Sequence, residues 1–277
     1  MMQAVDTERP DFERRFGGLA RLYGQAGAAR IRSAHVVVVG IGGVGSWAVE
    51  GLARSGVGRL TLIDMDHVAE SNINRQIHAL DDTLGQAKVQ AMRERIAQIN
   101  PSCEVICIEE FVEPANWPGL IAQGPHVDAV IDACDQVVAK TAMAVWARDH
   151  SSSQRYITVG AAGGKTQAHL VAVDDLVNVT HDPLLAQLRY RLRKHHGAPR
   201  APESSRTGKK TPRKIGIACV YSREAVQGPA QDDEACSVGG DGSLNCSGYG
   251  SLVSVTATFG LCASGWVLNR IAAADLM

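Results

Sequence analysis

The sequence has few of the features expected of an exported protein. Its seven cysteines are scattered and form no Cys-x-x-Cys pair, so they do not indicate a disulfide framework. The first 18 residues carry acids and arginines and lack the apolar run of a secretory signal. We therefore expect reduced thiols and a cytoplasmic protein.

An excess of one charge and a clear membrane span are also lacking. The 28 lysines and arginines nearly balance the 29 aspartates and glutamates, so attraction to nucleic acid has to come from local clusters of charge. Residues 242–269 contain no charged residue and are long enough to cross a bilayer. Serine, threonine, asparagine and glycine interrupt this stretch, however, which favours a helix buried in protein over a membrane span.

The first half of the chain alternates strand-like and helix-like segments. The β-branched run HVVVV ends at a glycine, and the segment that follows predicts a helix stopped by a second glycine. Strands are predicted over residues 35–39, 59–66, 104–108, 127–132 and 156–159, and helices over residues 43–55 and 86–99. This order is typical of βαβ units, so we expect an α/β fold with a parallel sheet.

The second half has a different composition. Asp182 followed by Pro183 predicts a helix start, with the carboxylate as cap and proline at the first helical position. Ten basic residues and one acid lie between Arg189 and Lys214, and the proline, glycine and serine content there favours a mobile basic insertion at about 195–214. Ordered structure is predicted again over residues 215–224, and a buried helix over about 250–272.

A glycine-rich turn, G-I-G-G-V-G, joins the first strand to the first helix. Its glycines are Gly40, Gly42, Gly43 and Gly45. Glycines let the backbone approach phosphate closely, and a helix N-terminus offers free amides. Asp64, at the end of the second strand, is placed to accept hydrogen bonds from ribose hydroxyls. The motif alone fits a nicotinamide or flavin site as well as an ATP site.

Polar residues beyond Asp64 favour ATP over a hydride-transfer cofactor. Hydrogen-bond donors and two fixed positive charges are supplied there by Asn72, Arg75, Gln76 and Lys88. An adenylating enzyme must stabilise charge on the α-phosphate and on departing pyrophosphate, whereas hydride transfer has no triphosphate to neutralise. Asp135, after the strand that ends in DACD, could hold the magnesium ion that such chemistry requires.

These segments together resemble the superfamily of ubiquitin-activating, molybdopterin-adenylating and thiamine-adenylating enzymes, which are ThiF-like. The resemblance rests on GIGGVG, LIDMD, SNINRQ, GQAKV and DACD. It implies a doubly wound, Rossmann-like, mainly parallel sheet with a C-terminal extension. It also implies that Asp64 binds ribose, that Asn72, Arg75 and Lys88 bind the triphosphate of ATP, and that Asp135 ligates Mg²⁺.

Within the superfamily, four further segments resemble the tRNA threonylcarbamoyladenosine dehydratases. They are RRFGGLARLYG, NRQIHAL, HDPLLAQLR and ACVYSRE. This likeness implies adenylation of the threonine carboxylate next to the tRNA anticodon, followed by cyclisation with release of AMP and pyrophosphate. It implies tRNA as a partner, and a cysteine desulfurase with its sulfur acceptor as possible protein partners. The basic insertion departs most from the family, which leaves the tRNA-facing geometry open.

The resemblance also implies an assembly. In the adenylating relatives, the region of Arg15 donates an arginine across a two-fold interface to the partner's ATP, so we expect a homodimer. We expect a single domain over 1–277, with an N-terminal arm (1–30), a nucleotide-binding half (31–176) and a substrate and dimer half (177–277). Arginine suits the role because its planar fork binds phosphate oxygens and stays charged.

Two other functions remain open at the level of sequence. The runner-up is an adenylating enzyme for a ubiquitin-like sulfur carrier, and the third is a nicotinamide-binding oxidoreductase. Sulfur-carrier enzymes of the superfamily commonly hold zinc with two Cys-x-x-Cys pairs, and since this sequence has none, no structural zinc is expected. Cys246, in LNCSGYG, matches a cysteine of the dehydratases and is either structural or part of a sulfur relay.

Overall fold

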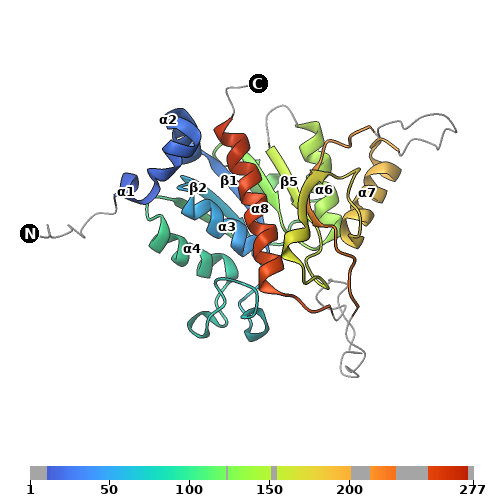
Figure 1. The fold of residues 1–277 in the computed structure, drawn as a ribbon, viewed down its shortest axis with the longest axis horizontal. Coiled ribbons are helices and arrows are strands. Elements are labelled where there is room, and N and C mark those ends of the chain that lie inside the picture. The colour runs from blue at the N-terminus through green and yellow to red at the C-terminus, as the bar shows by residue number, and fades with distance from the viewer. Residues whose placement is uncertain (1–10, 123, 151–154, 201–212, 229–248, 274–277) are drawn as a thin grey trace, which may run out of the picture.

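The core of the fold is one seven-stranded sheet. A computed structural model describes residues 11–122, 124–150, 155–200, 213–228 and 249–273 (Figure 1). In sheet order the strands are β3 (Glu104–Ile108), β2 (Arg59–Ile63), β1 (His35–Val39), β4 (Ala129–Asp132), β5 (Arg155–Val159), β7 (Ala218–Ser222) and β6 (Val171–Asp175). All neighbours are parallel except β6 and β7, which are antiparallel.

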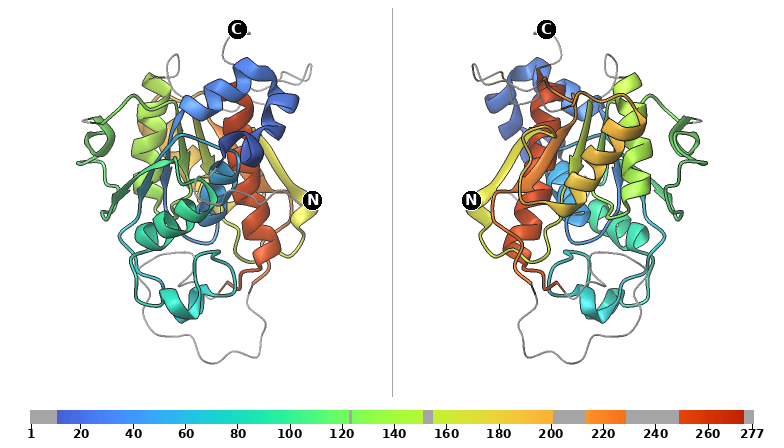
Figure 2. Two further views of the ribbon diagram at one scale, coloured as in Figure 1. Left: turned by 90° about the vertical axis from the view of Figure 1, so that its left-hand side faces the viewer. Right: turned by 90° about the vertical axis from the view of Figure 1, so that its right-hand side faces the viewer.

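Helices cover both faces of this sheet (Figures 1 and 2). One face packs against α2 (Gly18–Ser33), α3 (Gly45–Arg54), α4 (Lys88–Ile99) and α8 (Val253–Ala272), and the other against α6 (Val137–Asp149) and α7 (Pro183–His195). Two short helices, α1 (Phe12–Phe16) and α5 (Gly119–Ala122), and three 3₁₀ turns, Glu70–Asn72, Asp81–Thr83 and Ala168–Leu170, complete the described elements. The doubly wound α/β fold expected from the sequence is confirmed.

The alternation of strand β1 explains the two-sided core. Val36 and Val38 face the layer that contains α3 and α8, whereas Val37 and Val39 face the layer that contains α6 and α7. All four valines are buried, which suits a central parallel strand covered on both sides. The sheet order reverses between β1 and β4, and ligands of open α/β sheets bind outside the strand ends at such a switch point.

Helix α8 contains residues 253–269 of the uncharged stretch that the sequence favoured as buried in protein. Small residues bring it close to α3: a Cβ on Gly260 would lie 2.4 Å from the carbonyl oxygen of Val44, and a Cβ on Gly51 would lie 2.5 Å from Ser264 Oγ. Such contacts need glycine because any side chain would clash with the neighbouring helix. Among the described residues, no helix is both long and apolar enough to cross a membrane.

The described part of the expected N-terminal arm is helical. Asp11 caps α1 by accepting hydrogen bonds from the amides of Glu13 and Arg14. Helix α2 then packs along α8, where Tyr23 Oη donates to Asn269 Oδ1 at 2.9 Å. The sequence led us to expect residues 1–30 as an N-terminal arm, and from Phe12 onward this part of the chain is helical and packs against the domain.

The second half of the chain completes the same sheet. Strand β7 lies between β5 and β6, so residues from both sides of the basic insertion join the sheet. Asp182 caps α7 as the sequence predicts, since its carboxylate accepts the amide of Leu185 at 2.9 Å. Most of the basic insertion (201–212) and Cys246 lie outside the described residues.

Candidate functional site

A cleft of about 750 Å³ opens where the strands β1, β2, β4 and β5 end. It lies at the switch point of the sheet, where the four strands point their carboxyl ends at one space. The structure brings eight of the sequence-predicted site residues to this cleft. They are Gly40, Gly42, Gly43, Asp64, Arg75, Gln76, Lys88 and Asp135.

The glycine turn is built from close backbone contacts. Gly40 has a φ of +83°, and a Cβ there would lie 2.8 Å from the amide nitrogen of Cys134. A Cβ on Gly45 would lie 1.7 Å from the carbonyl oxygen of Gly40, so Gly45 fixes the turn from the start of α3 without lining the cleft. The turn thus leaves Gly42 and Gly43 at the surface of the cleft, without side chains that would keep a phosphate away.

Asp64 is held as an acceptor beside the glycine turn. Its Oδ2 accepts the amide of Ile41 at 2.5 Å, and its Oδ1 accepts the amide of Asp66 at 2.8 Å. Burial raises the pKa of Asp64, and the positive charge of Lys88 opposes this rise. Each carboxylate oxygen keeps a second lone pair, so the group can still accept hydrogen bonds from a vicinal diol.

Lys88 begins α4 and reaches into the cleft. Its Nζ lies 2.6 Å from Asp66 Oδ2, and its side chain is 7 % exposed while that of Asp66 is 55 % exposed. The lysine is therefore a nearly buried cation whose partner is largely in water. An anion entering the cleft would meet this ammonium group in surroundings where water screens it weakly.

Arg75 and Gln76 close the cleft on the side of α3. The Nη1 of Arg75 donates to Ser71 O at 2.7 Å and to Asn74 Oδ1 at 2.8 Å, and the indole of Trp47 donates to the Arg75 carbonyl at 2.9 Å. Burial lowers the pKa of Arg75 somewhat, but a guanidinium stays charged. Gln76 is 4 % exposed, and within the described part of the chain its Oε1 has no hydrogen-bond partner.

Below Asp135, the end of β4 is fixed by a buried ion pair that the sequence reasoning missed. Lys140 Nζ lies 3.0 Å from Asp132 Oδ1, and both side chains are fully buried. Burial alone would lower the pKa of Lys140, but the charge and hydrogen bond of Asp132, together with Cys134 and Asp182, outweigh it and raise the pKa. Asp132 also accepts the hydroxyl of Tyr156 at 2.7 Å and the amide of Cys134 at 3.3 Å. These bonds fix the turn that carries Asp135 into the cleft.

A second buried arrangement shapes the end of the cleft beyond β5. Lys165 is 2 % exposed and donates to the carbonyls of His181 and Glu224 at 3.1 Å and 2.7 Å. Asp182, the cap of α7, also accepts the amide of Ala161, a cleft residue, at 2.9 Å. The Asp-Pro pair indicated a helix cap, and the family-like segments HDPLLAQLR and ACVYSRE contain His181 and Glu224, but neither signal indicated a cleft wall.

Asn72 does not line this cleft. Asn72 is buried, and its Oδ1 accepts the amide of Ala69 at 3.1 Å, which closes a turn before Arg75. Its predicted contact with the triphosphate stays a prediction. Among the described residues, no group of three or more histidines, cysteines, aspartates and glutamates is placed to hold a metal ion.

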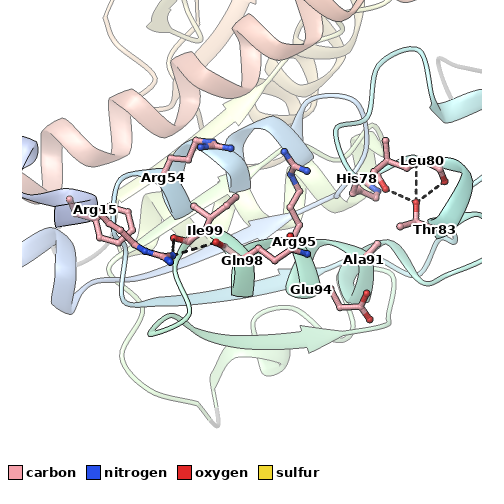
Figure 3. Close-up of a pocket in the computed structure, with 11 residues that line it drawn as sticks. Arg15, Arg54, His78, Leu80, Thr83, Ala91, Glu94, Arg95, Gln98 and Ile99 are labelled. Carbon is pink, nitrogen blue, oxygen red and sulfur yellow. Dashed lines mark hydrogen bonds between the residues drawn. The ribbon is translucent and has the colours of Figure 1, made fainter. Parts of the chain in front are cut away.

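Arg15 lies at a different hollow of the same chain, of about 620 Å³ (Figure 3). Its Nη1 donates to the carbonyls of Gln98 and Ile99 at 3.3 Å and 2.7 Å, at the C-terminal end of α4. Lys88 begins the same helix, so about 17 Å of helix separates the two ends. Within its own chain Arg15 therefore does not reach the cleft, and its expected action on a partner's ATP stays a prediction.

The chain is similar to known proteins in both sequence and fold. The chain matches the ThiF family over residues 15–273. It is 42 % identical to the tRNA threonylcarbamoyladenosine dehydratase of Escherichia coli over 95 % of each chain, and 41 % identical to that of Haemophilus influenzae over 94 % of each. The crystal structure of the E. coli dehydratase in complex with ATP is similar with a TM-score of 0.80 and 40 % identity, covering 95 % of this chain and 96 % of that one.

Proposed function

We propose that this chain, which belongs to the ThiF family, dehydrates threonylcarbamoyladenosine next to the tRNA anticodon with ATP as the activating substrate. The observation that carries the proposal is the cleft at the strand ends, where the glycine turn, a diol acceptor and two cations meet. A sheet that ends in such a cleft fits a nucleotide, and relatives that share about two fifths of the sequence bear the dehydratase name.

The reaction needs activation because a carboxylate is a poor electrophile. A threonine carboxylate oxygen attacks the α-phosphorus of ATP, a P–O bond to pyrophosphate breaks, and a mixed anhydride forms. A nitrogen of the modification then attacks the activated carbonyl, loses its proton and closes a ring, and AMP leaves with the former carboxylate oxygen. Water is lost overall, and its oxygen ends on AMP.

The chain contributes positioning and fixed charge to this scheme. Asp64 accepts the ribose hydroxyls, and the glycine turn lets the phosphates approach the backbone. Arg75 and Lys88 stabilise the negative charge that develops at the α-phosphate and on the leaving pyrophosphate. Ring closure is intramolecular, so proximity supplies much of its rate and no protein nucleophile is required.

The cleft also fits a magnesium ion held mainly by the nucleotide. Mg²⁺ usually keeps several waters and takes one or two protein carboxylates together with substrate phosphates. Asp135 supplies one carboxylate at the rim of the cleft, on the turn fixed by Asp132 and Lys140. The ion would neutralise phosphate charge, and Asp135 would hold it on the side of β4.

Further parts of the proposal concern assembly and location. A homodimer would bring Arg15 of one chain to the ATP of the other, since Arg15 lies outside the cleft of its own chain. A cysteine desulfurase and its sulfur acceptor are the proposed protein partners, with Cys246 as the candidate contact for sulfur. A tRNA-modifying enzyme of this kind would act in the cytoplasm.

One assay tests the function. The protein is incubated with ATP, Mg²⁺ and threonylcarbamoylated tRNA, and AMP, pyrophosphate and the RNA product are measured, the last by a mass decrease of one water. We expect equal amounts of AMP and cyclised nucleoside. A parallel reaction replaces tRNA with a ubiquitin-like sulfur carrier ending in Gly-Gly. Pyrophosphate release that requires the carrier and ignores tRNA would overturn the dehydratase assignment in favour of sulfur-carrier activation.

A further inference from the structure

One face of α7 differs from an ordinary solvent-exposed helix face. Its exposed residues are Pro183, Ala186, Gln187, Tyr190, Lys194 and His195, which we call the α7 face. Pro183, Gln187, Tyr190 and Lys194 follow one another at intervals of three or four residues and so form a stripe along the helix, with Ala186 and His195 beside it. Tyr190 is 59 % exposed in the middle of it, and α7 contains no acidic residue.

Two arginines of α7 donate hydrogen bonds to backbone carbonyls outside the helix, whereas Lys194 does not do so within the part of the chain that the structure describes. Arg189 donates to the carbonyls of Leu176 and Val179 at 3.0 Å and 2.7 Å, and Arg193 Nε donates to Pro199 O at 3.0 Å. Lys194 instead lies over the ring of Tyr190, with Nζ 5.3 Å from its centroid. Within the described ranges, no cation of α7 forms a salt bridge. A solvated helix face usually mixes both signs of charge, so a surface of one sign is unusual.

The N-terminal end of α7 lies at the cleft. Leu184, in the first turn of α7, lines the cleft. Asp182, the cap of α7, accepts the amide of the cleft residue Ala161. Tyr190 is six residues beyond Leu184, about 9 Å along the axis at 1.5 Å per residue. Stacked nucleotides are spaced by about 3.4 Å, so the ring lies two to three nucleotides away from the cleft.

We infer that the α7 face binds the single-stranded loop of the RNA substrate, with a base stacked on Tyr190 and a phosphate bound by Lys194. The inference rests on the proposed function, because it takes the modified nucleotide to lie in the cleft and its loop neighbours to run along α7. Sequence-tolerant RNA sites combine an exposed aromatic ring with cations that follow the backbone, and the α7 face offers both. The absence of acids on α7 matches the uniform negative charge of RNA.

The test measures the affinity of a threonylcarbamoylated anticodon stem-loop RNA by fluorescence anisotropy, with a non-hydrolysable ATP analogue present. Loss of one base–aromatic stack typically weakens binding roughly five- to 150-fold, so we expect Kd to rise within that range for Tyr190→Ala. Tyr190→Phe keeps the ring and should bind like the wild type. Lys194→Ala should lower the slope of log K against log salt by about 0.7 to 0.9.

A matched control is available at the other end of the molecule. Arg32 lies over the ring of Phe12, 4.1 Å from its centroid, and α1 and α2 lie on the side opposite to α7 (Figure 1). Arg32→Ala removes a cation beside an aromatic ring there, and it should leave both Kd and the salt slope unchanged. Equal effects of Arg32→Ala and Lys194→Ala would overturn the inference, because they would show a general response to net charge.

The outcomes separate this inference from the proposed function. If wild-type protein cyclises the tRNA and Tyr190→Ala binds the stem-loop with unchanged Kd, only the proposed RNA-binding role of the α7 face is refuted. The RNA-binding role is also refuted if Tyr190→Ala weakens binding of a protein partner while its Kd for the RNA stays unchanged. If the wild type forms no cyclised tRNA, the proposed function itself fails. The expected kinetic signature is a raised KM for tRNA with an unchanged kcat for Tyr190→Ala.

Discussion

Replacement of Lys88 by alanine separates catalysis from stability most clearly. The change removes the ammonium group 2.6 Å from Asp66 Oδ2 and leaves the rest of the cleft in place. Lys88 is nearly buried, but the Asp66 side chain is 55 % exposed, so water solvates the carboxylate that is left behind and we expect the loss of the pair to cost only about 1 kcal/mol. For a chain of this size, a loss of 1 kcal/mol lowers Tm by roughly 2–4 °C.

The expected effect on turnover is much larger. Loss of one preformed donor to a charge that develops in the transition state typically lowers kcat by roughly 100- to 1,000-fold. We therefore expect AMP formation to fall by at least about 100-fold while Tm falls by only about 4 °C or less. Single-turnover release of pyrophosphate at saturating ATP and tRNA, together with thermal unfolding of the same preparation, measures both quantities.

Asp66→Asn is the matched control, because it removes the partner of Lys88 but keeps the ammonium group. It should lower the rate by much less than Lys88→Ala does, and it should change Tm by a similar small amount. Near-normal turnover of Lys88→Ala would refute the assignment of Lys88 to the triphosphate. An equal loss in both variants would mean that the ion pair, and not the lysine charge, matters for the reaction.

Three further predictions follow from other parts of the molecule. Lys140→Met leaves Asp132 buried without its cation, so the free energy of unfolding in urea should fall by about 3–5 kcal/mol; a fall below about 1 kcal/mol would contradict the described ion pair. Burial and the charges of Lys88 and Arg95 lower the pKa of His78 from 6.5 to about 4, so the unfolded chain binds a proton that the folded chain does not. Stability should therefore decline by up to about 3 kcal/mol as the pH falls from 6.5 towards 4, and His78→Leu should remove that part of the decline in urea titrations at each pH. Mixing inactive Arg15→Ala with inactive Lys88→Ala should restore activity at about a quarter of the wild-type sites if subunits exchange, whereas exchange without activity would show that Arg15 does not act in trans.

The elements with strong local signals were predictable from the sequence. The run HVVVV gave β1 with the observed bounds, and residues 104–108 became β3 as expected. Helix α6 and strand β6 were missed. The VAVDD sequence of β6 leaves most of its side chains partly exposed, and such an edge strand lacks the apolar run of the central strands. Helix α6 was missed in part because it buries Lys140 completely, whereas a lysine in a sequence normally indicates a solvent-facing position.

The site was predictable to the extent that the fold dictates it. Gly40, Asp64 and Asp135 follow three strands that proved to be neighbours, and parallel strands deliver the residues after their carboxyl ends to one edge. Arg15 was not predictable in this way. Its contact with the carbonyls of Gln98 and Ile99 joins residues more than eighty positions apart, and no local pattern encodes such a distance.

The sequence by itself therefore determined the strands and helices with strong periodicity, the glycine turn and the set of residues able to bind a nucleotide. These depend on backbone conformation and on residues close in the chain, which local sequence specifies. Only the tertiary structure decided that Lys140 neutralises Asp132 inside the domain, that His78 is buried beside Lys88 and Arg95, and that α7 leads away from the cleft. Those features depend on packing between distant segments, where burial and charge act together once the whole chain has folded.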